Sequence, residues 1–590
     1  MKKRFLALLI APLALTSCSL LNSSQSYETY AEEIGVYNID KLDTQNTLTS
    51  GFQTAVTARF IENEKYIPYL TLKQYASLYD VHFADDVKSE VDEGFNSCSW
   101  TVYKGKQPCF VTEINYYTEK IILAGSLDAA YKDDDDPRDL VALNYGLDID
   151  GDVAYLSNKT YATFSFKDLG IKHFEYNNEH YFPLGLLDIT YVDSSTIYFT
   201  YNYTHILSTR DVDNYETVSY IDTNLEHYTF DSQMEEKVLG QSIPQYLIKY
   251  NANLFIYMMN NFYGLKEYKG IKSFASYYKV NGIYSSLFSE NDRTRGMAYS
   301  DALSILDDNH TLLVSANKSW GEDSCGLIRR YGQGCFNRSE LRTTLQSYRT
   351  STYGSATPGK TVLYSQDRKT ALFSFDSFMF GTSTQVFNED GSIKVDAGDY
   401  DTYFLILNLL QELKSQGTVE NVVLDVSLNG GGVVGVMLKL LCLLSKENSS
   451  RFAIYEDTSS SVVNYRTRID LNGDNKYETN ECFGNDFNFY ILTSDYSFSC
   501  ANAFPCAAQV QNHAKIIGQK SGGGECAVSI HYMPNSEYVY HSSNLHLGSY
   551  NEEKKQFNGF EGGAKPDIAL AIDQNFYSVE AINTAIQNAQ

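Results

Sequence analysis

The sequence predicts an α/β fold whose last part is a parallel-rich sheet with flanking helices, preceded by a helical subdomain and an α+β N-terminal domain. Three observations lead to this. From residue 361 onward, short apolar strands alternate with helical segments, which is typical of a largely parallel sheet. Between residues 242 and 306, apolar residues recur with helical spacing. Before residue 240, two short segments of similar sequence each predict a strand followed by a helix.

The first eighteen residues predict export and lipid attachment. A basic start precedes an apolar run over 5–15, which is too short to span a membrane permanently. The segment Leu15–Thr16–Ser17–Cys18 then resembles a bacterial lipobox, in which the cysteine is lipidated after the signal is removed. We expect residues 1–18 to be a lipoprotein signal peptide and 19–48 a linker. The alternative is an ordinary signal peptide with an incidental Cys18. On the lipoprotein interpretation the chain is membrane-anchored through Cys18 and faces outside the cytoplasm.

Composition limits the partners. The 590 residues hold 47 Lys+Arg against 73 Asp+Glu, a net charge of −26, which argues against binding to nucleic acid. The 48 tyrosines suggest an exposed surface adapted to export. Because the exported compartment can be oxidising, two close cysteine pairs are candidate disulfides: Cys98 with Cys109, and Cys325 with Cys335.

Residues 49–240 form the expected N-terminal domain, which contains a weak internal repeat. Residues 62–72 match residues 177–186, and each copy predicts a turn, a short strand and a helix. The pattern loosely resembles the N-terminal modules of copper amine oxidases. No metal cluster accompanies it, so we infer no copper and expect a spacer or recognition domain. Carbohydrate or cell-wall attachment through residues 51–240 is a weaker alternative.

Residues 241–590 form the second expected unit, with a helical part over 241–315 and a core over 361–590. About fifty residues of loop-like character follow His310, too few for an ordinary PDZ domain. The helical part has expected helices at 246–263, 269–278 and 296–306. The core has expected strands at 370–375, 419–426, 487–492 and 514–517, and expected helices at 400–416, 433–444 and 500–512.

Ser499 stands where an apolar strand ends and a helix begins. A hydroxyl at that corner lies beside free backbone N–H groups, which can hold a developing oxyanion. A serine at this place also commonly serves as a helix N-cap. The neighbouring Cys500 is another candidate nucleophile, although no basic neighbour is visible to lower its pKa.

A second motif has the same chemistry. A buried strand ends in Asn429–Gly430–Gly431–Gly432 at a helix start, and glycines let backbone N–H groups turn toward a ligand. No Gly-Lys-Ser/Thr follows, so a nucleotide-binding P-loop is not expected.

The segments 425–432, 493–504, 516–524 and 566–568 occur in the order seen in S41 peptidases. This family includes the tail-specific C-terminal-processing proteases and the tricorn core protease, and the resemblance covers about residues 242–590. It implies a crotonase/ClpP-like core and a serine endopeptidase that acts on polypeptides through an acyl-enzyme, without a required cofactor. Ser499 would be the nucleophile, and the N–H groups of Gly431 and Cys500 would form the oxyanion hole.

The resemblance leaves the base open between two branches. Tail-specific proteases use a lysine at the position that aligns with Gly524, and Lys520 lies near it. The tricorn-type branch uses a histidine in a Leu-Asp-Asp-x-His-Thr segment, here His310, whose side-chain type titrates near working pH. Glu561 matches the acidic residue that would orient His310. Asn309 replaces a serine that can join this relay, so a non-catalytic binding lipoprotein remains an alternative.

A calcium site is also predicted. Residues 470–481 space oxygen ligands like an EF-hand loop, although the flanks predict strand and loop. The alternative is an acidic surface turn. The expected ligands are Asp470, Asn472, Asp474, Lys476 through its backbone, Glu478 and Glu481.

Overall fold

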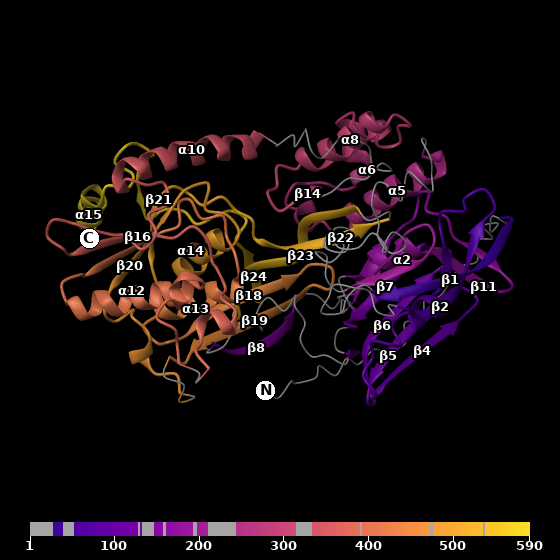
Figure 1. Ribbon diagram of the computed structural model, residues 1–590, viewed down its shortest axis with the longest axis horizontal. Helices are drawn as coiled ribbons and strands as arrows, with labels where there is room; N and C mark the ends of the chain where they lie inside the picture. Colours follow the sequence, from indigo (N-terminus) through magenta and orange to yellow (C-terminus); the bar gives the residue numbers. More distant parts are fainter. Residues whose placement is uncertain are drawn as a thin grey trace.

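The computed structural model describes residues 27–38, 52–127, 130–131, 147–156, 161–192, 197–209, 243–313, 333–389, 392–471, 474, 476–534 and 537–589. Figure 1 shows an elongated molecule with the N-terminal strands at one end and the strands and helices after residue 361 at the other. The long strands β22 and β23 run between the two ends. The predicted α/β fold class is confirmed.

The core of the second unit is a six-stranded sheet. All its neighbouring strands pair in parallel except β15, which lies antiparallel to β16 at one edge. The order is β15 (Val362–Tyr364), β16 (Thr370–Ser374), β17 (Asn421–Asp425), β20 (Asn488–Thr493), β21 (Lys515–Gly518) and β25 (Ile568–Ala569). The strands predicted from sequence are therefore present, with ends shifted by one or two residues.

Helices cover both faces of this sheet. Val422 and Leu424 of β17 pack into a cluster with α12 (Thr402–Gln416), α13 (Val434–Leu444) and α14 (Cys500–Val510). Val423, which points to the other face, packs with residues of α10 (Gln333–Tyr353) and α15 (Val579–Asn588). The short α11 spans Ser383–Val386, and the 3-10 turns η4 and η5 span Ala397–Asp399 and Thr479–Glu481.

The prediction of a loop-like stretch after His310 is wrong over α10. This 21-residue helix is rich in Ser, Thr and Arg, and its tertiary contacts outweigh its composition. Its Leu345 is buried in the core. Its Arg349 is also buried, with Nη2 2.9 Å from Asp425 Oδ2 and Nη1 2.6 Å from Asp376 Oδ1. The helix is thereby held against the end of β17.

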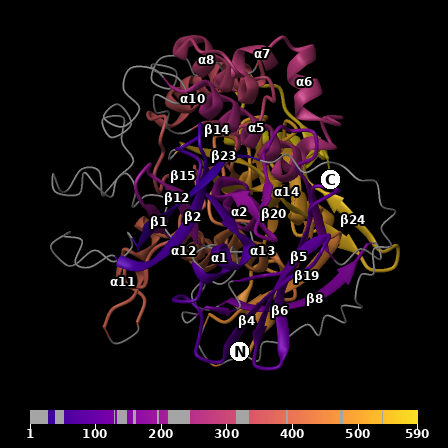
Figure 2. The same cartoon turned by 90° about the vertical axis from the view of Figure 1, so that its right-hand side faces the viewer.

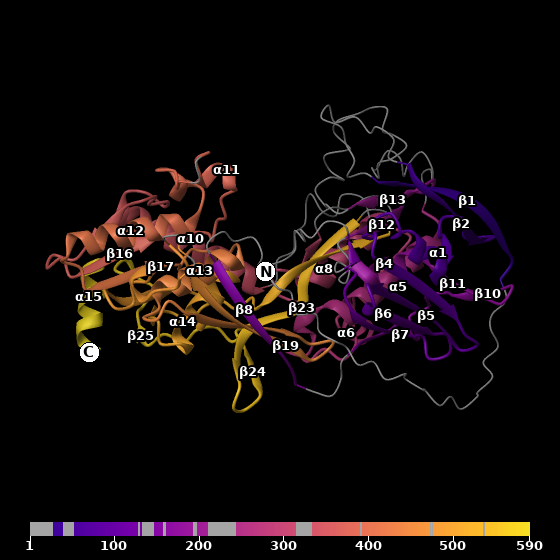
Figure 3. The ribbon, with the colours of Figure 1, turned by 90° about the horizontal axis from the view of Figure 1, so that it is seen from below.

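A second sheet lies beside the first, in the order β14-β23-β18-β19-β8, with β22 and β24 also paired to β23, and it is antiparallel. Its strands are β8 (Leu147–Tyr155), β14 (Leu312–Leu313), β18 (Ser450–Glu456), β19 (Ser461–Ile469), β22 (Cys526–Met533), β23 (Glu537–Asn551) and β24 (Gln556–Gly559). Strand β8 comes from the N-terminal part of the chain, yet it pairs with β19 along its whole length, as Figure 3 also shows. The expected domain limits remain predictions.

The N-terminal part holds two further sheets. One has the order β10-β11-β3-β2-β1-β13-β12 and the other β4-β5-β6-β7-β9. The first comprises β1 (Thr29–Asn38), β2 (Phe52–Ile61), β3 (Tyr69–Thr71), β10 (Phe174–Tyr176), β11 (Glu179–Pro183), β12 (Tyr198–Tyr201) and β13 (Ile206–Thr209). The second comprises β4 (Val87–Glu93), β5 (Ser97–Lys104), β6 (Gln107–Asn115), β7 (Lys120–Gly125) and β9 (Ala162–Ser165).

The two sequence repeats lie side by side in the first of these sheets. Strand β3 of one copy pairs antiparallel with β11 of the other, with Leu70 opposite Phe182. Each strand runs directly into a helix, α1 (Leu72–Ser77) or α2 (Leu184–Tyr191). Figure 2 shows α1 and α2 between the two N-terminal sheets. Each predicted strand–helix unit is therefore present.

The helical part is also largely as predicted. It consists of α5 (Gln245–Phe262), α6 (Phe274–Val280), α7 (Tyr284–Leu287) and α8 (Asp292–Ser304), with the 3-10 turn η3 (Gly264–Lys266). Helix α6 begins later than predicted because Ser273 caps it, accepting the N–H of Ser276. None of the described helices combines the length and the apolar character that crossing a bilayer demands.

Two composition-based expectations are corrected. Tyrosines do not mark only the exposed surface, since several are fully buried: Tyr69, Tyr75, Tyr79, Tyr191, Tyr257, Tyr263, Tyr278 and Tyr299. Cys98 and Cys109 are both free, because they lie on neighbouring strands but out of register. Cys325 and the side chain of Cys335 lie outside the described residues.

Candidate active site

Ser499 lies on a strained corner between β20 and α14. Its backbone has φ 57° and ψ −127°, a conformation that costs a non-glycine residue about 1–3 kcal/mol and that clusters at active sites. Its N–H donates to the Gly523 carbonyl at 3.0 Å. Ser499 stands at the N-cap position of α14, but its side chain makes no capping hydrogen bond. The residue is partly exposed, so its hydroxyl is not used to hold the helix.

Gly431 faces Ser499 from the glycine-rich turn after β17. Its φ is +116°, and a Cβ added to it would lie 2.7 Å from Ser499 Cβ and 3.1 Å from Ser499 Oγ. The Gly431 carbonyl accepts the N–H of Phe378 at 2.9 Å, which fixes the turn. A glycine is therefore required here for the backbone to approach the serine.

Replacing Gly431 with alanine is expected to lower kcat/KM by about 100-fold or more, because the methyl group would displace Ser499 and the donors around it. Gly430→Ala is the matched control, since a Cβ at Gly430 meets nothing within 4 Å. Peptide hydrolysis and Tm are measured for both variants. Full activity in Gly431→Ala would show that this turn lies away from the reaction.

The two expected oxyanion donors differ in this structure. The Cys500 N–H stands at the first position of α14, where a helix leaves its amides unpaired. The Gly431 N–H instead donates to Asn429 Oδ1 at 2.8 Å. The Asn429 amide group in turn donates to the Phe375 carbonyl at 3.1 Å. A substrate carbonyl oxygen would have to take the place of the Asn429 oxygen to use the Gly431 N–H.

The Cys500 thiol is not suited to be a nucleophile. It is buried, and its Sγ lies 3.0 Å from the Gly432 carbonyl, to which it donates. Burial raises the pKa of Cys500 to about 12, so almost no thiolate exists near neutral pH. Its contribution to the site is therefore its backbone N–H.

His310 is brought to the same place from a distant part of the chain. Its ring packs edge to face against Phe498, the neighbour of Ser499, with 4.8 Å between ring centroids. Asp308 holds the loop, because its carboxylate accepts the His310 N–H at 3.0 Å and the hydroxyls of Thr311 and Ser542, each at 2.7 Å. Ser542 lies on β23, so the loop is tied to the second sheet.

The His310 ring is buried and its Nδ1 has no hydrogen-bond partner among the described residues. Burial lowers its pKa, while Asp308 and the Cys526 carbonyl oppose that shift. The neutral form, which can accept a proton, is therefore favoured. No hydrogen bond joins His310 to Ser499 among the described residues, and such bonds are often formed only when substrate binds.

Glu561 lies against the segment that follows β21. Its Oε2 accepts the N–H groups of Gly524 and Glu525, each at 2.9 Å. Burial raises its pKa, partly offset by the hydrogen bond from the Glu525 N–H. Within the described residues no hydrogen bond links Glu561 to His310. Glu561 fixes the segment whose Gly523 carbonyl holds Ser499.

Residues 391–570 match the model of peptidase family S41. This part of the chain belongs to peptidase family S41. The match includes Gly431, Ser499 and Glu561 and begins after His310. The predicted family and the predicted enzyme class, a serine-type peptidase, are thus confirmed, and the substrates of such an enzyme are polypeptides.

Several solved structures are similar to the chain at low identity. A protein from Parabacteroides merdae ATCC 43184 that is described as a peptidase has 17% identity, covering 53% of this chain and 88% of its own, with a TM-score of 0.36. The photosystem II D1 C-terminal processing protease has 13% identity, covering 36% of this chain and 46% of its own, with a TM-score of 0.27. Mature CPAF complexed with lactacystin has 11% identity, covering 58% of this chain and 98% of its own, with a TM-score of 0.35. No curated protein matches the chain.

A side chain at Gly524, which we expect to align with the tail-specific lysine, would require Phe498 to shift. Gly524 has φ +83°, and a Cβ there would lie 2.5–2.8 Å from ring atoms of Phe498. The ring that packs on His310 therefore also fills the space beside Gly524. Lys520, the alternative base, is exposed. Burial raises the pKa of Asp495, and the charges of Arg338 and Lys520 partly offset that shift.

The predicted calcium ligands are not gathered around one point in the described part of the loop. Glu481 is buried and its carboxylate accepts the N–H groups of Leu471 at 2.8 Å and Glu478 at 2.7 Å. Asp474 pairs with the Lys476 ammonium group at 3.2 Å. Asn472 lies outside the described residues, and Asp470 is partly exposed. Calcium binding remains a prediction.

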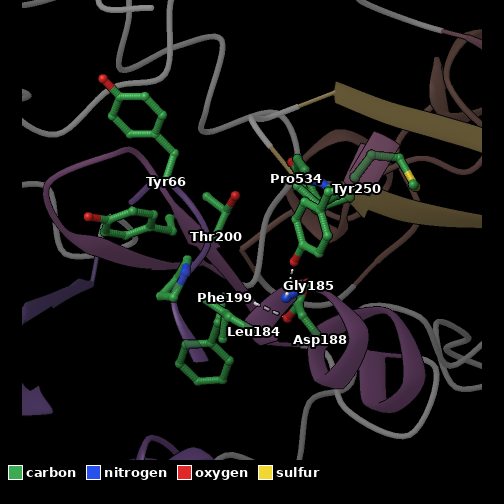
Figure 4. Close-up of a pocket in the computed structure, with 12 residues that line it drawn as sticks. Tyr66, Leu184, Gly185, Asp188, Phe199, Thr200, Tyr250 and Pro534 are labelled. Atoms are coloured by element: carbon green, nitrogen blue, oxygen red, sulfur yellow. Dashed lines mark hydrogen bonds between the residues drawn. The ribbon is translucent and has the colours of Figure 1, made fainter. Parts of the chain in front are cut away.

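Another pocket lies away from these residues, between the N-terminal part and the end of the β22–β23 hairpin (Figure 4). Gly185 donates its N–H to Tyr250 Oη at 3.2 Å, and Phe199 donates its N–H to Asp188 Oδ1 at 2.7 Å. Burial raises the pKa of Asp188 well above its usual range. None of the predicted site residues lines this pocket. Cys18, the predicted lipidation site, lies outside the described residues.

Proposed function

We propose that this S41 peptidase is a surface-anchored serine endopeptidase with Ser499 as nucleophile and His310 as general base. The observation that carries the proposal is the juxtaposition at Phe498. Phe498 precedes Ser499, whose backbone is strained and whose side chain makes no capping hydrogen bond. The Phe498 ring packs on the buried ring of His310. Two segments almost 190 residues apart thus meet at Phe498, which supports a hydroxyl and an imidazole acting together.

The steps follow from these groups. Ser499 Oγ attacks the carbonyl carbon of a peptide bond while His310 accepts the Oγ proton. The Cys500 N–H, and the Gly431 N–H once it leaves Asn429, stabilise the negative oxygen. His310 then delivers its proton to the leaving amine, and the C–N bond breaks. Water, activated by the same imidazole, hydrolyses the acyl-enzyme and restores Ser499.

Glu561 acts as a positioning residue in this proposal. It draws the Gly524 and Glu525 amides together and so fixes the Gly523 carbonyl that holds the Ser499 N–H. Burial raises the pKa of Glu561, and the nearby carboxylates of Glu525 and Asp308 raise it further. A negative environment of this kind also stabilises the imidazolium that forms during the reaction.

A serine-directed covalent probe and the pH dependence of hydrolysis test the function together. We expect the probe to label wild-type protein but not Ser499→Ala. Because burial lowers the pKa of His310, the base stays neutral as pH falls through 6.5. We therefore expect kcat/KM to remain constant down to about 6.5 and to decline only at lower pH. A decline that begins well above this range, unaltered in His310→Gln, would contradict a histidine base.

A second candidate is a catalytically inactive binding lipoprotein on the peptidase fold. The hydrogen bond between the Gly431 N–H and Asn429 favours it, because one oxyanion donor is already used. The absence of probe labelling at every pH, in folded protein, would establish this candidate in place of the enzyme.

We further propose that Cys18 carries the lipid that anchors the enzyme outside the cytoplasm. The support is the basic, apolar and lipobox-like order of residues 1–18. In cells of the source organism, Cys18→Ser is expected to abolish lipid labelling and to move the enzyme out of the membrane fraction. Unchanged membrane association of Cys18→Ser would refute the anchor.

A further inference from the structure

Three side chains able to bind a metal lie together next to Glu561. They are Glu525, Cys526 and His546, and one ligand atom of each lies within 4.8 Å of the other two. All three residues are buried. Among the described residues, no other set of three or more His, Cys, Asp and Glu side chains has this arrangement. Neither the peptidase mechanism nor the predicted calcium loop uses these groups.

The fold places these groups on one side of the second sheet. Cys526 and His546 are directly opposite each other on β22 and β23, where neighbouring side chains meet. Cys526 Sγ and His546 Nδ1 are 3.5 Å apart. Zinc bonds of about 2.3 Å to sulfur and 2.0 Å to nitrogen, at a tetrahedral angle, separate the two atoms by about 3.5 Å.

Glu525 supplies the third ligand atom. Its Oε1 lies 2.8 Å from His546 Nδ1, so an ion between the two would have to widen this separation by about half an ångström. Its Oε2 accepts the Glu561 N–H at 2.6 Å. One oxygen of Glu525 is therefore fixed by the backbone, and the other faces the cysteine and the histidine.

A carboxylate lies near the other ring nitrogen of His546, as is common for histidines that bind a metal. Asp457 Oδ2 lies 3.5 Å from His546 Nε2, and this buried nitrogen has no hydrogen-bond partner among the described residues. A carboxylate at the second ring nitrogen orients the ring and fixes which nitrogen binds the metal.

We propose that Glu525, Cys526 and His546 bind one zinc ion, or a chemically similar borderline-soft divalent cation, with Asp457 orienting the histidine. A mixed thiolate, imidazole and carboxylate set selects such an ion over calcium or magnesium. The ion would fasten the segment before β22. The Gly523 carbonyl of that segment holds Ser499, and its Gly524 and Glu525 amides hold Glu561. The site is independent of whether the proposed peptidase is active.

Protons compete with the ion, because cysteine binds a metal as the thiolate and histidine as the neutral ring. Binding therefore releases protons, and the affinity for the ion increases with pH.

Metal titration of the full chain, stripped with a chelator, tests the site. We expect calorimetry to show one equivalent of Zn²⁺ with proton release, and Co²⁺ in its place to give a thiolate-to-cobalt charge-transfer absorption band. Cys526→Ser and His546→Gln should weaken Zn²⁺ binding by more than about 100-fold, and Asp457→Asn by about 10- to 100-fold. Cys482→Ser is the matched control. It removes a buried thiol elsewhere, and its hydroxyl can still donate to the Thr479 carbonyl.

The alternatives give different results. Equal Zn²⁺ uptake by wild type and Cys526→Ser would show that the ion binds elsewhere, and an absence of uptake would show an ordinary buried ion-pair network. Both outcomes overturn the site. If Cys526→Ser does not fold, the cobalt band in wild type and its weakening in Asp457→Asn still decide the question, because that band requires a thiolate ligand.

Discussion

Ser499→Ala is expected to lower kcat for peptide hydrolysis by about 10⁴- to 10⁶-fold, as loss of a serine nucleophile does in enzymes of this type. The residual rate would come from the oxyanion donors and substrate binding alone. The change removes one oxygen atom from a side chain that makes no capping hydrogen bond. The fold and Tm should therefore be preserved, and steady-state kinetics with the melting curve check both.

A matched variant separates catalysis from strain at the same position. Alanine keeps the Cβ that makes φ 57° and ψ −127° unfavourable, whereas glycine adopts this backbone without penalty. Ser499→Gly should thus be as inactive as Ser499→Ala but more stable by about 1 kcal/mol or more. Hydrolysis by either variant at the wild-type rate would remove Ser499 from the mechanism.

His310→Ala is the second large expected effect, with kcat/KM lowered by about 10³-fold or more through loss of the general base. Lys520→Ala should change kcat/KM by less than about twofold, because this ammonium group is exposed and its charge has only a weak effect on the nearby Asp495. The two variants are compared in one peptide-hydrolysis assay. His310→Gln serves as a control that keeps the packing on Phe498 without a base.

The opposite pattern of activity would identify the other branch of the family. If Lys520→Ala were inactive and His310→Ala active, the base would be lysine and the packing of His310 on Phe498 only structural. Loss of activity in both variants, with normal Tm, would make the two residues part of one site and contradict a mechanism with a single base.

The sheet and the main site segments were predictable because their signals are local. A strand with every residue buried, as in β17, appears in the sequence as an apolar run, and Ser499 appears at the change from strand to helix. Helix α10 was not predictable, since its stability depends on Arg349 meeting Asp425 and Asp376 far along the chain. The burial of Tyr75 and Tyr79 depends in the same way on the contact between two sheets.

The details of the site depend on contacts that composition does not encode. Two such contacts are the hydrogen bond from the Gly431 N–H to the Asn429 side chain and the packing of the Phe498 ring beside Gly524. Both depend on how the folded backbone brings these residues together. The group of Glu525, Cys526 and His546 was missed because a strand register sets it. Cys526 and His546 are twenty residues apart and meet only because β22 pairs with β23 at that place. The only sign of this metal site in the sequence was that Glu525 and Cys526, two residue types that bind metals, are adjacent.

The pairing of β8 with β19 has a consequence for how this protein is made. During synthesis β8 leaves the ribosome more than 300 residues before its partner, since Leu147 pairs with Ile469. Until then its nine residues present unpaired backbone groups, which can bind other chains. Closing so long a loop is also slow. The two N-terminal sheets contain no strand from beyond β13, so they need not wait for this partner, whereas β8 itself stays unpaired with β19 until β19 has been made.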